Sequence, residues 1–143
     1  MTSSRSRADW ELLHSLMLLY AAASLLHFAH NAVYIDEYPN LPAWLSAADV
    51  WLTWLAEFAL GVAGFVLMRR HHFFIGHALV AVWAALGFDG LAHYALAPPS
   101  AHTFAMNATI WTEVCAAGLL SIAIAWRVAQ RLALTRSRID PSR

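Results

Sequence analysis

The chain has 143 residues, of which 60% are hydrophobic and only 13% are charged, and its formal net charge is zero. Soluble domains carry about a quarter charged residues, so this composition excludes an ordinary soluble domain, and the length allows a single domain over 1–143. The basic residues are all arginines and lie in clusters, which argues against a nucleic-acid-binding face. A lone cysteine, Cys115, excludes a disulfide within the chain.

Four apolar runs, at about 10–34, 42–68, 73–97 and 103–128, lie between polar tails at 1–9 and 132–143. Each run exceeds the roughly 20 residues that a helix needs to cross the hydrocarbon core. The runs are rich in Ala and Leu and do not alternate, which favours helices over strands, and Pro42 suits the first turn of the second helix. Because the loops are short, we expect an all-α, polytopic membrane protein with four antiparallel transmembrane helices in one bundle.

The arginines predict the orientation of this bundle. They precede the first run, separate the second from the third, and follow the fourth, whereas the other two loops contain none. By the positive-inside rule both termini are cytoplasmic, as expected for a multi-pass protein of the cell inner membrane. Aromatic residues near the arginine-free loops fit an outer interfacial belt: Tyr34, Tyr38, Trp44 and Tyr94.

Ionisable side chains inside the apolar runs are the most informative feature of the sequence. Each costs about 2.5–3.5 kcal/mol to insert, and such residues normally face the bundle interior and indicate a functional site. His27 and Asn31 share one helix face, as do Asp89 and His93, because each pair is four residues apart. The spacing places five residues in the outer half or near the midplane, around one outward-facing chamber: His27, Glu57, Asp89, His93 and Glu113.

Imidazole and carboxylate together suit a transition metal, and the sequence does not distinguish zinc, iron, copper and manganese. We expect all five residues to converge as metal ligands, with Glu57 and Glu113 as the candidate catalytic acids or bases. Other histidines are expected outside this site. His30 and His102 are predicted to be solvated near the outer interface, and His14 and His77 lie near the inner surface. Asp49 is predicted to lie near the outer interface, in water or in the site.

Several alternatives stay open at this point. The site could be a metal-free acid–base centre in a proton-coupled transporter or a membrane isomerase, or His27 and His93 could ligate haem. Buried carboxylic acids could also serve only as hydrogen-bonding groups in an assembly subunit. Cys115 lies in an apolar setting, and no nucleophile motif is present. The expected partners are the bilayer, a small or lipophilic substrate entering from the outer side, and a homo-oligomer or membrane complex.

Overall fold

The structure, a computed structural model, describes residues 2–139, and its side chains are described over 7–136. The described residues are almost entirely helical and contain no strand. Three short 3-10 turns connect or interrupt the helices: η1 (Ile35–Glu37), η2 (Asp89–Ala92) and η3 (Pro99–Ala101). The α-helices are α1 (Thr2–Val33), α2 (Ala47–Arg69), α3 (Phe73–Leu86), α4 (His93–Leu96) and α5 (Phe104–Ile139).

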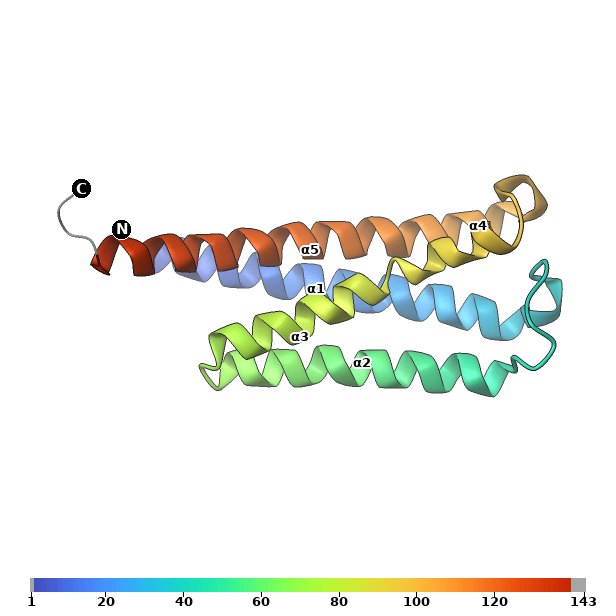
Figure 1. Cartoon of the computed structure of the whole chain (residues 1–143), viewed down its shortest axis with the longest axis horizontal. Coiled ribbons are helices and arrows are strands. Elements are labelled where there is room, and N and C mark those ends of the chain that lie inside the picture. The colour runs from blue at the N-terminus through green and yellow to red at the C-terminus, as the bar shows by residue number, and fades with distance from the viewer. Residues whose placement is uncertain (1, 140–143) are drawn as a thin grey trace.

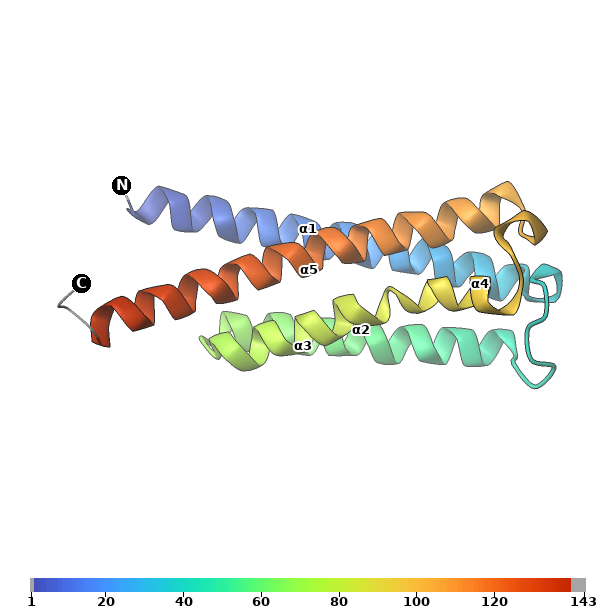
Figure 2. The same ribbon diagram turned by 45° about the horizontal axis from the view of Figure 1, so that its top comes forward.

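The helices form one elongated bundle (Figures 1 and 2). α1 packs along α5 and α2, while α3 packs along α2 and α5. Both chain ends and the α2–α3 turn lie at one end of the bundle, which we call the terminal end. The opposite end, formed by the segments 34–46 and 97–103, is called the loop end. Short turns therefore give the antiparallel order that the sequence predicts.

Four helical segments are long and apolar enough to cross a membrane, so the predicted multi-pass architecture is confirmed at this level. They cover Arg7–Val33, Ala47–Arg69, Phe73–Leu96 and Phe104–Arg136. Helix continues into both predicted polar tails, because α1 begins at Thr2 and α5 continues to Ile139. Helices that are already nucleated inside the membrane extend at little cost. Residues 1 and 140–143 of the predicted tails lie outside the described part of the chain.

The start of α2 differs from the prediction. Pro42 does not occupy the first turn, because Ser46 is the N-cap of a helix that begins at Ala47. The Ser46 hydroxyl accepts from the Asp49 amide at 3.3 Å, and the Asp49 carboxylate accepts from the Ser46 amide at 2.9 Å. This reciprocal capping box satisfies two amides that the helix start leaves unpaired. Asp49 therefore has a structural role at the loop end.

An apolar core fills the terminal half of the bundle. It is built from buried side chains of α1, α3 and α5, among them Leu13, Tyr20, Val80, Trp83 and Leu120. Two glycines of α2 let α3 approach closely, since an added Cβ at Gly61 would overlap the Trp83 ring and one at Gly64 would lie 2.7 Å from Val80. The core closes the terminal half and leaves the buried polar groups on its loop side.

The third span is broken, which corrects the prediction of one continuous helix over 73–97. α3 ends at Leu86, and the amides of Gly87 and Phe88 bond to carbonyls only three residues back. The Trp83 carbonyl accepts instead from the hydroxyl of Tyr20 on α1, at 3.0 Å. A backbone group without a partner is costly inside a membrane, so this side chain from a neighbouring helix stabilises the break.

Gly87 makes the same junction sterically possible. Its φ of −67° is ordinary for any residue. The junction therefore needs glycine because it has no side chain, and not because of its backbone angle. A Cβ at this position would lie 2.6 Å from the Tyr20 ring and 2.8 Å from Ala117 of α5. Beyond the junction, the chain continues as η2 and α4, which carry Asp89, Gly90 and His93 toward the loop end of α1 and α5.

Candidate functional site

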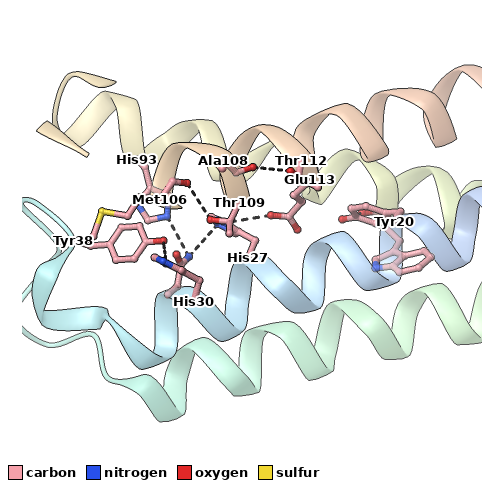
Figure 3. Close-up of polar contacts among 12 residues, drawn as sticks. Tyr20, His27, His30, Tyr38, His93, Met106, Ala108, Thr109, Thr112 and Glu113 are labelled. Carbon is pink, nitrogen blue, oxygen red and sulfur yellow. Dashed lines mark hydrogen bonds and ion pairs between the residues drawn. The ribbon is translucent and has the colours of Figure 1, made fainter. Parts of the chain in front are cut away.

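His27 lies at the centre of the buried polar groups. It comes from α1, is only 2% exposed, and lies between Thr109 and Glu113 of α5 (Figure 3). Its Nδ1 is 3.4 Å from the Thr109 hydroxyl, and its ring lies edge-on to the His93 ring with 5.6 Å between centroids. The broken third span therefore brings two histidines that are far apart in sequence into contact.

Asn31 links the two imidazoles. Its amide nitrogen is 3.0 Å from Nε2 of His27 and 3.3 Å from Nε2 of His93. An amide nitrogen can only donate, so both Nε2 atoms accept, and the proton of neutral His27 is on Nδ1. That proton faces the oxygen of Thr109, whose own hydroxyl donates to the Met106 carbonyl at 3.0 Å. The network therefore holds His27 neutral, with a basic nitrogen facing the interior.

Glu113 is the most deeply buried ionisable residue of the site, with 0% of its surface exposed. Its Oε2 lies 3.7 Å from Nε2 of His27. Neither carboxyl oxygen has a hydrogen-bond partner of good geometry among the described residues, although the buried Ser24 hydroxyl of α1 is a donor near this carboxyl group. Gly90 faces this pair, since a Cβ there would lie 3.7 Å from both the carboxyl oxygen and the imidazole nitrogen. A buried carboxyl group without hydrogen bonds requires a proton or another cation from outside this network.

The other two predicted carboxylates lie farther from the histidines. Glu57 of α2 is buried, and its Oε2 has no hydrogen-bond partner in the described part of the chain. Asp89 is exposed on the wall of a cavity that His27 and His93 also line. The structure thus brings His27, His93 and Glu113 into a compact group, and adds Glu57 and Asp89 as more distant charges.

A cavity of about 160 Å³ lies beside this group, between α1, α2 and η2. This volume could hold several water molecules at about 30 Å³ each. Leu41 and Leu45 bound it at the loop end. Its polar wall consists of His27, Asn31, Thr53, Asp89 and His93, and its apolar wall includes Phe28, Leu41, Leu45 and Val50.

Tyr38 covers the site from the loop end, a role that sequence analysis missed by placing it in the aromatic belt. It is buried, its hydroxyl bonds to Nδ1 of His30 at 2.8 Å, and its ring lies 4.9 Å from the His93 ring. Burial raises the pKa of Tyr38 to about 12, so the phenol stays protonated and donates to His30 at ordinary pH. Nothing in the sequence distinguished Tyr38 from Tyr34 and Trp44, the other aromatic residues of the same loop.

His102 is also buried, in contrast to the predicted solvated position, because its ring turns back onto the Pro98 carbonyl and against Tyr94. His77, expected near the inner surface, is buried against Phe73 at the terminal end. Within residues 7–136, whose side chains are described, no group of three or more His, Cys, Asp or Glu side chains is arranged to hold a metal ion. The metal therefore stays a prediction.

Comparison with family models, curated proteins and solved structures gave no match to this chain.

Proposed function

We propose that the protein is a multi-pass membrane protein whose loop-end cavity is an acid–base site for a small molecule. In this proposal His27, which lines the cavity, exchanges a proton with the bound molecule, and Glu113 behind it supplies or stabilises that proton. Asn31 and His93 orient the imidazole. The observation that carries the proposal is the fully buried Glu113 carboxyl group, without hydrogen bonds in the described residues, 3.7 Å from a nitrogen of His27 that faces it as an acceptor.

The chemistry follows from the groups around the cavity. A proton on the ligand can pass to Nε2 of His27, and the resulting imidazolium lies beside the Glu113 carboxylate. In the reverse direction, a protonated Glu113 can donate the proton. Positioned acid–base pairs of this kind act best where water is limited, and apolar residues line the opposite wall. A compact, partly apolar molecule with one ionisable or hydrogen-bonding group fits this cavity.

The break in the third span supports the same proposal. Non-helical backbone at membrane depth is tolerated where it is buried in protein or lines a cavity, and interrupted helices commonly frame substrate and ion sites in membrane transporters. Here the interruption places Gly90 against the pair formed by His27 and Glu113. A proton-coupled transporter and a membrane isomerase would both use such a site.

A bound transition metal is the second candidate, and one observation favours it. The Nε2 atoms of His27 and His93 are both directed at Asn31, and Glu113 adds a carboxyl oxygen 3.7 Å from one of them. Neighbouring ligands of a tetrahedral ion with bonds near 2.0–2.1 Å lie roughly 3.4 Å apart, close to the 3.7 Å between the His27 nitrogen and the Glu113 oxygen. Rotation of the Asn31 amide would present its oxygen as a fourth ligand, and Glu57 and Asp89 would act as outer charges.

Infrared difference spectra between acidic and neutral pH should test the proposed proton exchange on protein purified in detergent. We expect the wild type to show the C=O band of a buried carboxylic acid, and Glu113→Gln to remove it. Glu11→Gln should leave the band unchanged, because Glu11 is exposed at the terminal end. His27→Ala should shift the pH at which the band develops. If Glu113→Gln removes no band, the proposed role of Glu113 is wrong.

Elemental analysis of the same preparations separates the two candidates. The acid–base proposal expects no stoichiometric first-row metal in the wild type. A stoichiometric metal that is lost in His27→Ala and His93→Ala but retained in Glu11→Gln would instead establish the metal site.

We also infer that the loop end faces the outside of the cell and that both termini face the cytoplasm of the inner membrane. Arg7, Arg69, Arg70 and Arg127 lie toward the terminal end, whereas the segment 34–46 carries Asp36 and Glu37 and no arginine.

An impermeant thiol reagent should test this orientation in intact cells. In a Cys115→Ala background, Trp44→Cys should be labelled from outside, because Trp44 is 77% exposed at the loop end. Arg70→Cys, exposed in the α2–α3 turn, should react only after the membrane is permeabilised. Labelling of both positions from the same side would contradict the four-span topology.

A further inference from the structure

A second cavity, of about 190 Å³, lies in the terminal half of the bundle, apart from the loop-end site. It is an apolar groove between α1 and α2. Gly61 of α2 packs directly on the Trp83 ring of α3, and both residues line this groove. Its walls include Met17, Leu18 and Ala21 of α1 and Phe58, Val62 and Phe65 of α2.

Aromatic rings and a cation close the terminal end of this groove. Phe65 stacks on His14 with 5.4 Å between centroids, and on Trp10 with 6.1 Å between centroids. The Arg127 guanidinium of α5 lies 5.9 Å from the centre of the Trp10 ring. One turn farther along α5, Arg131 lies 5.6 Å from the centre of the Phe73 ring. The Trp10 ring thus contacts both Phe65, which lines the groove, and the Arg127 guanidinium, so positive charge lies close to this end of the groove.

Arg127 lacks the acceptors that a half-buried guanidinium requires. Its Nε and Nη1 are shielded from solvent and have no hydrogen-bond partner in the described part of the chain. His77, which is 2% exposed, interacts with the charge of Arg127, and its Nε2 is also unpartnered among the described residues. Asp9 of α1 is an opposite charge near Arg127 but forms no ion pair with it in the described part of the chain. The unpartnered N–H groups of Arg127 are therefore suited to an acceptor supplied from outside the chain.

We propose that the groove binds one anionic phospholipid from the leaflet at the terminal end. One acyl chain lies in the groove between α1 and α2, and the phosphate accepts hydrogen bonds from Arg127. Guanidinium groups match phosphate oxygens in geometry and charge, and basic pockets between membrane helices recognise anionic headgroups. Arg69 and Arg131 at the same end favour a lipid with net negative charge over one that carries a choline.

Native mass spectrometry of the purified full chain should test this, with phosphatidylglycerol and phosphatidylcholine as the added lipids. We expect one tightly retained phosphatidylglycerol in the wild type and no comparable retention of phosphatidylcholine. Arg127→Gln should weaken phosphatidylglycerol retention by about tenfold or more. Arg136→Gln is the matched control, because it removes the same charge from an exposed position at the same end and should leave retention unchanged.

A second variant tests the groove separately from the headgroup. Ala21→Phe fills the groove without touching the arginines, and it should also abolish retention, while circular dichroism should report an intact bundle. Equal weakening by Arg127→Gln and Arg136→Gln would overturn the proposal, since diffuse charge would then explain the binding. Unchanged retention in Ala21→Phe would overturn it as well, and so would equal retention of the two lipids. None of these results depends on the acid–base chemistry of the loop-end cavity.

Discussion

Replacing Glu113 with leucine should raise the thermal unfolding midpoint of the protein in detergent, by an amount equivalent to about 1–3 kcal/mol. The wild-type carboxyl is completely buried, and neither oxygen has a hydrogen-bond partner in the described residues. Leucine has no polar group to desolvate and fits beside Ile110 and Gly90. His27 keeps its partners Thr109 and Asn31 in this variant. Stabilisation upon removal is the behaviour of a group retained for function.

Glu113→Gln provides the comparison for this measurement. The amide retains a buried polar group without a clear partner, so we expect no gain in the unfolding midpoint. Both variants should lack the carboxylic acid band in infrared spectra. If Glu113→Leu instead lowers the midpoint by several degrees, the carboxyl is a structural partner of His27, and the acid–base proposal loses the observation that carries it.

Gly87→Ala should destabilise the bundle by about 1–3 kcal/mol, although alanine is the better helix former. The added Cβ would lie 2.6 Å from the Tyr20 ring and 2.8 Å from Ala117, both of which are fully buried and have no space to move. Relief of the clash would also move the Tyr20 hydroxyl away from the Trp83 carbonyl. Thermal unfolding followed by circular dichroism measures the loss.

Gly118→Ala is the control for that substitution. It makes the same chemical change in α5, but an added Cβ there has no neighbour within 4 Å. We expect a neutral or slightly stabilising effect, of about 0.5–1 kcal/mol, from helix propensity alone. Equal effects of the two substitutions would show that the close contact at Gly87 does not hold the third span in its broken form.

The four spans could be predicted from the sequence because crossing the hydrocarbon core requires an apolar run of sufficient length. The chain contains four such runs. The break at Gly87 could not be predicted, since a single glycine in an apolar run commonly continues as helix. The break is stabilised by the Tyr20 hydroxyl, which lies 63 residues from Trp83, the residue whose carbonyl it satisfies. Such long-range compensation has no local signature.

The candidate site was predictable in part because ionisable groups are costly inside the hydrocarbon core. The insertion cost identified His27, His93 and Glu113, and the structure brings these three together. Tyr38 carries no such cost, because tyrosine is common at membrane interfaces, so its burial over His93 left no signal in the sequence. The spacing of Ser46 and Asp49 alone indicates a capping box. The helix was nevertheless predicted to begin near Pro42, because the apolar run begins there.

The depth of Glu113 has an electrical consequence. It lies nine residues into α5, about 14 Å along an axis that crosses roughly 30 Å of hydrocarbon. In the proposed orientation, a cation that reaches Glu113 from outside crosses about half of the membrane potential. A full crossing is worth about 2.3 kcal/mol per 100 mV, so half is worth about 1 kcal/mol, or about fivefold in occupancy. The apolar core below Glu113 thus makes the charge state of this site responsive to the energisation of the membrane.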